Sequence, residues 1–309
     1  MIETVFSAEL PIGEHLLIQK NRIAGQGGPG PRIAVVTGVH GDELEGQYVA
    51  FELGRILQAN LDKLCGTVDI YPAINPLGIN SIQRGVPTFD LDLNRTFPGD
   101  AHGALTETLA AAVFNDIKGA AVAIDIHASN IFLREMPQVR INELSADTLL
   151  PLAPMLNVDY VWVHASATVL ESTLAYSLNT AGTPCLVVET GVGMRITEEY
   201  GERLTQGVLR LAAHLGVWKG DFKADEAPIV SRDGDVSYLN AGAAGIFLPR
   251  ATHASMVEEG QLIGIIADPL SGEVHEEVRA ERAGLLFTLR EYPIVYPGSL
   301  LARILGDVQ

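Results

Sequence analysis

Hydrophobic residues in the part of the chain before residue 220 follow two alternating patterns. Short runs of apolar and β-branched residues, bounded by Gly, Pro or Asn, predict buried strands. Longer segments with apolar residues three or four positions apart predict amphipathic helices. The predicted strands are 32–39, 67–74, 120–126 and 184–188, and the predicted helices are 45–60, 105–117, 172–181 and 198–215. Because strands and helices alternate, we expect an α/β fold in which helices flank a sheet.

A different pattern begins near residue 220. Short apolar runs there are separated by Gly, Pro and Asp and show no helical spacing. The runs are 245–249, 260–266, 284–289 and 293–297. This arrangement predicts a smaller all-β domain. We therefore expect two domains, residues 1–222 and residues 223–309.

Composition and charge narrow the classes of function. The chain has 309 residues, of which 47% are hydrophobic and 19% charged, as in a globular protein. Its 21 Lys and Arg against 38 Asp and Glu give a net charge of −17, so we expect neither nucleic acid nor a membrane as partner. The two cysteines form no disulfide framework, no apolar run could span a membrane, and the start lacks a signal peptide's basic residues. These features predict a cytoplasmic protein.

The segment His40-Gly-Asp-Glu43 follows the first buried strand of the predicted sheet. Residues that leave such strands are where α/β proteins place their sites. Gly38 and Gly41 flank the histidine and are expected to let the backbone approach a ligand closely. A histidine and a glutamate three residues apart can bind one metal ion at a loop-to-helix turn.

A third ligand is available at the end of another predicted strand. Catalytic zinc usually has three protein ligands and one open position. His127 follows the strand 120–126, and Asp125 shares its face of that strand, where it can support the imidazole. Either histidine alone is more typical of a core or loop position, but the pair at two strand ends favours a metal site.

Other polar residues lie near these segments. Arg84 and Arg95 stand out in an acidic protein and can grip a substrate carboxylate, or else form surface salt bridges with Asp90 or Asp92. Glu189 ends a hydrophobic strand, so it is either a site residue or a strand-end surface residue. Burial would raise its pKa toward that of a general base.

Together, four motifs resemble the succinylglutamate desuccinylase/aspartoacylase family of the zinc carboxypeptidase superfamily. They are Gly38-Val-His40-Gly-Asp-Glu43, Asp92-Leu-Asn94-Arg95-Thr-Phe-Pro-Gly99, Asp125-Ile-His127 and Val188-Glu189-Thr-Gly191. The resemblance covers nearly the whole chain, including the C-terminal β domain. It implies a mixed sheet flanked by helices, with the β domain near the mouth of the active site. It also implies one Zn²⁺ per chain and hydrolysis of the amide bond of an N-acyl amino acid.

The resemblance assigns a role to each matched residue. The zinc ligands it implies are His40, Glu43 and His127. Glu189 matches the general base that acts on metal-activated water. Asn94 and Arg95 match the groups that bind the substrate carboxylate.

Some assignments stay open in the sequence. Arg84 lies about where the family has an arginine that polarises the scissile carbonyl, although this segment matches more loosely. A tyrosine near the substrate is also expected, and the candidates are Tyr238, Tyr292 and Tyr296. Arg134 and Arg140 could add positive charge to the pocket or lie in solvated loops.

These expectations describe a zinc-dependent amidohydrolase that acts on a small N-acyl amino acid. One alternative is a metallocarboxypeptidase that uses the same zinc chemistry on peptides. Another is a non-catalytic binding module on the same fold. The sequence leaves open the acyl group, the amino acid and whether the chain forms a homo-oligomer.

Overall fold

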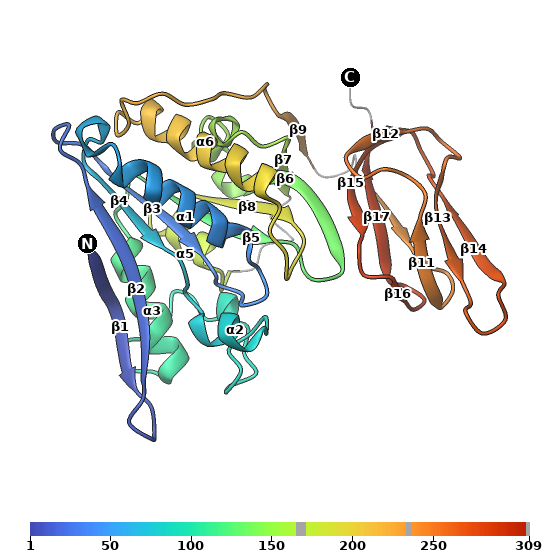
Figure 1. Ribbon diagram of the computed structural model, residues 1–309, viewed down its shortest axis with the longest axis horizontal. Helices are drawn as coiled ribbons and strands as arrows, with labels where there is room; N and C mark the ends of the chain where they lie inside the picture. Colours follow the sequence, from blue (N-terminus) through green and yellow to red (C-terminus); the bar gives the residue numbers. More distant parts are fainter. Residues whose placement is uncertain (165–170, 233–235, 307–309) are drawn as a thin grey trace.

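The computed structural model describes residues 1–164, 171–232 and 236–306 of the chain (Figure 1). Within these ranges, 13 strands form one mixed sheet. Its centre has four parallel strands in the order β4-β3-β5-β8, which are β3 (Arg32–Thr37), β4 (Thr67–Tyr71), β5 (Val122–Ala128) and β8 (Cys185–Gly191). Because parallel strands end at the same edge of a sheet, residues that follow β3 meet the ends of β5 and β8 there.

Further strands extend this centre on both sides. The antiparallel hairpin of β1 (Ile2–Glu9) and β2 (His15–Ala24) pairs with β4. On the other side, β6 (Leu133–Asn142) pairs with β8 in the antiparallel direction, and β7 (Tyr160–His164) and β9 (Ile229–Arg232) follow it in parallel. The sheet is therefore mixed.

Helices cover both faces of the sheet (Figure 1). Buried residues of α1 (Glu45–Gln58) and α6 (Glu198–His214) belong to the core on one face. Buried residues of α3 (Leu105–Ile117) and α5 (Leu174–Thr180) belong to the core on the other. Short helices in the connections are α2 (Pro76–Ser81), α4 (Ala146–Leu149) and the 3₁₀ turns η1 (Leu61–Lys63), η2 (Leu93–Arg95), η3 (Glu143–Ser145) and η4 (Ala153–Leu156). No helix in the described ranges is long and apolar enough to cross a membrane.

The C-terminal strands form two layers. One layer continues the main sheet because β15 pairs with β6, and it contains β10 (Val236–Asn240), β12 (Ser255–Val257), β15 (Gly284–Arg290) and β17 (Leu300–Leu305). The other is a 4-stranded sheet of β11 (Gly245–Pro249), β13 (Leu262–Ala267), β14 (Val274–Arg279) and β16 (Ile294–Val295). A separate apolar core that includes Phe247, Ile263 and Leu301 holds these strands together.

The predicted fold class is confirmed, but some elements differ from the prediction. The strands predicted to stop just before His127 and Glu189 continue through these residues, as β5 and β8. The hairpin β1–β2 and the strand β6 are missing from the sequence prediction. Strand β6 carries Glu135, Gln138 and Arg140, and these polar residues interrupt its apolar pattern.

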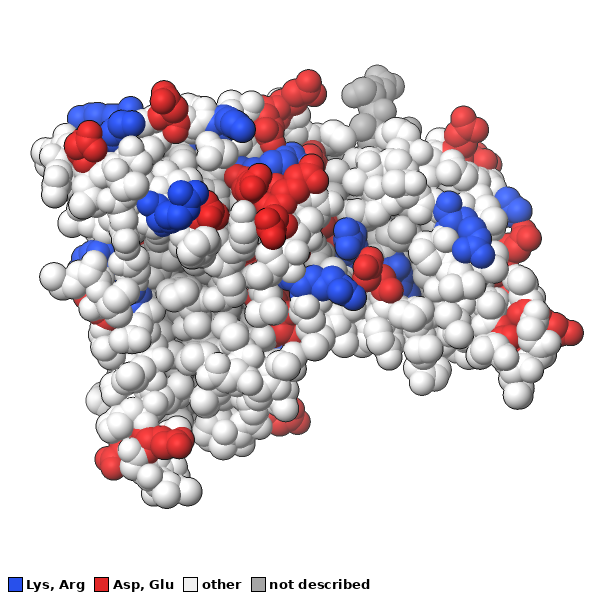
Figure 2. Space-filling model, in the orientation of Figure 1, with Lys and Arg blue, Asp and Glu red and all other residues white. Residues whose placement is uncertain are grey.

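Charged side chains are mixed on the surface that Figure 2 shows. Lys and Arg occur there as small separate groups among Asp and Glu. This face therefore has no continuous basic area of the kind that binds a phosphate backbone.

Candidate metal centre and active site

Three side chains that are far apart in the sequence meet at the carboxyl edge of the central strands. His40 and Glu43 lie in the loop between β3 and α1, and His127 lies near the end of β5. All three are buried, and their ligand atoms lie within 4.8 Å of one another. The Nδ1 atoms of His40 and His127 lie 2.6 and 2.8 Å from the two carboxylate oxygens of Glu43. Two imidazole nitrogens and a carboxylate around one point form the donor set of a catalytic zinc site.

Carboxylates lie behind both imidazoles. His40 Nε2 is 3.1 Å from Asp92 Oδ1, and His127 Nε2 is 3.1 Å from Asp125 Oδ2. Such contacts orient ligating histidines and fix which nitrogen faces the metal. Here they leave Nδ1 of each ring directed at Glu43.

The electrostatics of the group suit a cation. Burial alone would raise the pKa of Glu43, but His127 and His40 outweigh it and hold the pKa at about 2. Burial would lower the pKa of His127, yet Asp125 and Glu43 together raise it well above its usual value. The carboxylates around the two imidazoles therefore stabilise positive charge at this point. A divalent ion would supply such a charge, so the three residues fit a metal ion.

The glycines beside His40 serve the packing of the protein. Gly38 has a φ of +64°, a conformation that side chains disfavour. A Cβ atom at Gly41 would lie 2.4 Å from the backbone oxygen of Gln83. These glycines are therefore required by the close packing against α2 and the loop after it, and their role in admitting a ligand stays a prediction.

Glu189 stands next to the metal-binding group. It pairs with His127 in the register of β5 and β8, so both side chains lie on the same face of the sheet. Its side chain is 18% exposed, and the Nη1 atom of Arg140 lies 3.5 Å from its Oε1. Burial raises the pKa of Glu189, against the opposing charges of Arg140 and His127. A carboxylate with a raised pKa beside a metal site can accept and return a proton.

Asn94 and Arg95 reach the same cavity from η2. The Asn94 side-chain oxygen accepts a hydrogen bond from the backbone N–H of Leu174 at 2.9 Å, which leaves its amide NH₂ for a ligand. Arg95 bonds the backbone oxygen of Asn94 at 2.8 Å and also lies 3.8 Å from Asp92. The salt bridge between Arg95 and Asp92, which the sequence analysis gave as an alternative role for this arginine, is therefore present.

Arg84 lies against the metal-binding residues. Its Nη1 donates a hydrogen bond to Glu43 Oε1 at 2.8 Å, and its Nη2 is 3.0 Å from His40 Nε2. It is also 3.7 Å from Asp92. Arg84 is therefore close enough to act on a substrate atom beside the metal.

These residues line one cavity of about 620 Å³. Its charged lining residues are Arg84, Arg95, Arg140, Arg303, His40, His127, Glu43, Asp125, Glu135 and Glu189. Arg134 instead forms an ion pair with Glu291 at 3.3 Å and is absent from the described lining. The lining, as described, also lacks the candidates Tyr238, Tyr292 and Tyr296, so the tyrosine stays open.

Two charged lining residues were missed by the sequence analysis, Glu135 on β6 and Arg303 on β17. Glu135 is 1% exposed and accepts from Arg140 at 3.2 Å and from Arg303 at 2.7 Å. It also accepts from Gln138 at 2.9 Å and from the hydroxyl of Thr288. The only sequence signal was a set of polar residues within an apolar run, and nothing local related that run to the C-terminal strands.

Comparisons with known proteins show the family and the fold of the chain. Residues 29–215 match the family model described as the succinylglutamate desuccinylase/aspartoacylase catalytic domain. The N-alpha-acetyl-L-2,4-diaminobutyric acid deacetylase of Halomonas elongata is 27% identical over 290 residues, which cover 91% of this chain and 84% of that protein.

Solved structures share the fold over almost the whole chain. The product-bound ectoine utilization protein EutE (DoeB) from Ruegeria pomeroyi has a TM-score of 0.83 at 21% identity, covering 98% of this chain and 94% of that one. A succinylglutamate desuccinylase/aspartoacylase from Rhodobacter sphaeroides has a TM-score of 0.82 at 23% identity, covering 99% and 96%. The family model matches more than half of the chain, and the chain belongs to the succinylglutamate desuccinylase/aspartoacylase family.

Proposed function

We propose that this protein is a zinc-dependent hydrolase that cleaves the amide bond of a small N-acyl amino acid. One observation carries the proposal: the group of His40, Glu43 and His127 shares a single cavity with Glu189 and Arg95. A metal site, a base and a carboxylate-binding arginine are the parts that such a reaction needs. The deacetylase from Halomonas elongata, by its name, acts on a substrate of this class.

The metal would be held by His40, Glu43 and His127. Zn²⁺ supplies a Lewis acid that polarises a carbonyl group and lowers the pKa of water. Asp125 and Asp92 would keep the two imidazoles oriented, through their contacts of 3.1 Å with the Nε2 atoms.

Glu189 is proposed to move the proton. Its carboxylate accepts a proton from water as the water oxygen forms its bond to the acyl carbon. The amide C–N bond then breaks, and Glu189 returns the proton to the amine nitrogen. Water and the amide are thereby converted to a carboxylic acid and a free amino acid. The raised pKa of Glu189 favours both transfers, because a base works best when its pKa is near the working pH.

The arginines are proposed to orient the substrate and to stabilise charge. Arg95 and the amide NH₂ of Asn94 bind the carboxylate of the amino acid and hold the amide in place. Arg84, next to Glu43 and His40, faces the negative charge that develops on the acyl oxygen.

A peptide substrate is the alternative that the same chemistry allows. A cavity of about 620 Å³ is of the size that holds small molecules. Arg303 of β17 contributes to its wall, so the C-terminal strands restrict the space around the site. These two features support the smaller substrate.

The test combines metal analysis with a substrate panel. The zinc-loaded protein is assayed on N-acetyl and N-succinyl derivatives of aspartate, glutamate and 2,4-diaminobutyrate, and on short peptides. Glu189→Gln should retain zinc and lose activity by about 10²–10⁴-fold, because it removes the proton carrier. Glu199→Gln, on the exposed side of α6, is the matched control. Full activity of Glu189→Gln, or zinc far below one per chain, would contradict the proposal.

A further inference from the structure

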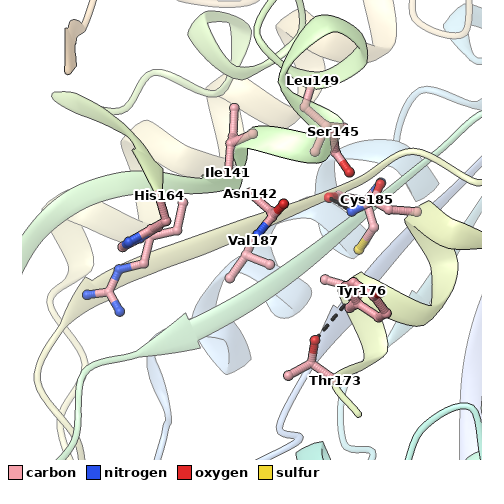
Figure 3. Close-up of a pocket in the computed structure, with 12 residues that line it drawn as sticks. Ile141, Asn142, Ser145, Leu149, His164, Thr173, Tyr176, Cys185 and Val187 are labelled. Atoms are coloured by element: carbon pink, nitrogen blue, oxygen red, sulfur yellow. Dashed lines mark hydrogen bonds between the residues drawn. The ribbon is translucent and has the colours of Figure 1, made fainter. Parts of the chain in front are cut away.

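Figure 3 shows a second cavity, of about 340 Å³, which shares part of its lining with the cavity around His40, Glu43 and His127. Four residues line both cavities, namely Arg140, Thr173, Ala175 and Val187. The shared residues make the two cavities immediate neighbours. Figure 3 shows Cys185 and Val187 of β8 on one side and Thr173 and Tyr176 on the other.

The sheet forms a continuous floor under both cavities. Alternate residues of a strand face the same side, so Cys185, Val187 and Glu189 of β8 share one face. Arg140 of β6 pairs with Val187 and continues the floor sideways. The four steps from Glu189 to Cys185 span about 13 Å, at the usual rise of a strand. This distance is longer than an acetyl group reaches.

The second cavity suits an uncharged, largely apolar group. Its described lining is mostly apolar, and Arg140 is its one lining residue with a permanent charge. Arg140 already forms ion pairs with Glu135 and Glu189. A charged ligand group beyond Arg140 would therefore have to compete with Glu135 and Glu189 for this one permanent charge.

Three polar side chains of the lining also have contacts within the protein. Asn142 accepts a hydrogen bond from the backbone N–H of Leu144 at 2.9 Å. Asn179 makes two hydrogen bonds with the backbone of Cys185. The ring of His164 stacks on Trp162, with 4.2 Å between centroids.

We propose that the second cavity binds the alkyl chain of the acyl group. The substrate is then an N-acyl amino acid whose uncharged chain is several carbons longer than acetyl. This inference rests on the proposed function. We assign the second cavity to the acyl part of the substrate, and not to its amino acid, for one reason. Asn94 and Arg95, which are proposed to bind the amino acid's carboxylate, line only the first cavity. The second cavity instead lies over the same floor as Glu189, where the acyl carbon is attacked.

The test is a series of N-acyl derivatives of aspartate, glutamate and 2,4-diaminobutyrate. The acyl groups are acetyl, butyryl, hexanoyl, octanoyl and succinyl. We expect kcat/KM to rise about fourfold for each added methylene until the cavity is full, which is the worth of burying that group. Succinyl should be cleaved more slowly than butyryl because of its terminal charge.

Two variants change the cavity in opposite directions. Ser145→Phe fills it from η3 and should lower the ratio of hexanoyl to acetyl kcat/KM at least tenfold. Tyr176→Ala enlarges it and should move the optimum to a longer chain. Leu144→Phe is the matched control, because Leu144 is 71% exposed and outside the described lining. It should leave the ratio as in the wild type.

A binding measurement provides a second readout. Zinc-loaded Glu189→Gln is titrated by calorimetry with the same series, and affinity should rise with chain length as kcat/KM does. Turnover that is fastest for acetyl, or unchanged chain-length dependence in both cavity variants, overturns this inference and leaves the proposed function. Dependence on the amino acid's side chain instead of the acyl chain also overturns it. No turnover and no binding of any member would overturn the proposed function itself.

Discussion

Two buried carboxylates only a short distance apart in the fold, Glu43 and Glu135, have opposite kinds of partner. Glu43 lies between the rings of His40 and His127, whose nitrogens carry lone pairs when neutral. Glu135 lies between the guanidinium groups of Arg140 and Arg303, which only donate hydrogen bonds and never lose their charge. Both carboxylates line the same cavity.

The difference shows that burial and charge alone do not make a metal site. The Glu43 group can exchange its protons for a metal ion, because imidazoles can lose a proton near neutral pH. The Glu135 group is already neutralised by permanent cations and has no free donor atoms for a metal. It connects β6 to β17, and therefore the central sheet to the C-terminal strands. We expect Glu135 and its two arginines to matter for the stability of the fold. We expect Glu43 and its two histidines to matter for the chemistry.

The largest expected effect is on the metal-binding group. His127→Ala should remove zinc and lower activity at least about a thousandfold, because the metal supplies several kcal/mol of transition-state stabilisation. Metal analysis and kcat/KM give the measurement, and circular dichroism checks the fold. His253→Ala, which changes a histidine of the C-terminal part, is the control. Zinc retained at one per chain would contradict the assignment of His127.

Loss of Glu135 should lower the stability of the fold. Glu135→Ala leaves Arg140 and Arg303 without their buried partner, so the free energy of unfolding should fall by about 3 kcal/mol. Urea denaturation of the zinc-loaded protein measures it, and zinc should stay near one per folded chain. Glu291→Ala removes the more exposed partner of Arg134 and should change stability by less than about 1 kcal/mol. Equal effects of both variants would refute a special role for Glu135.

A smaller effect, on zinc affinity, is expected at Asp125, which contacts the imidazole of His127. Asp125→Asn removes the negative charge that orients His127 and should weaken zinc affinity about 10–100-fold. Competition with a chelator measures the affinity. Asp90→Asn makes the same change at an exposed loop position and should have no effect. If both variants bind zinc as the wild type does, the contact of 3.1 Å between Asp125 and His127 has no such role.

The smallest expected effect is the release of protons from His40 and His127 when zinc binds, which the arginines around Glu135 cannot show. Hydrogen bonds to Asp92 and Glu43 outweigh burial and raise the pKa of His40, and the pKa of His127 is raised too. Because zinc binds neutral imidazole, binding at neutral pH should release protons, and affinity should fall as pH falls. Calorimetry in buffers with different heats of ionisation counts the released protons. Zinc binding without proton release would contradict the raised values.

The same shifts set the sign for the metal-free protein. A histidine whose pKa is higher in the folded protein than in the unfolded chain stabilises the fold when it is protonated. This contribution is complete at a pH below the pKa of the unfolded chain, and it is lost as the pH rises through the pKa of the folded protein. Metal-free protein should therefore lose stability toward alkaline pH. The arginines around Glu135 stay charged over this range and should add no such slope.

Local sequence was enough to predict the central strands and the meeting of His40, Glu43 and His127. His40, Glu43, His127 and Glu189 lie at or near strand ends, and an α/β pattern brings those ends to one edge. The strand β6 could not be predicted in this way. Two of its polar residues, Glu135 and Arg140, line the cavity and interrupt the apolar pattern, and Arg303, the partner of Glu135, is 168 positions away.

The sequence by itself determined which residue types stand at the ends of the central strands, because strand and helix periodicity are local properties. Only the tertiary structure decided that Arg140 reaches Glu189, that β17 supplies Arg303 to the cavity wall, and that a second cavity shares Val187 with the first. These features depend on the pairing of β6 with β8 and with β15. Pairing between distant strands is set by how their faces pack together, and no short stretch of sequence contains that information.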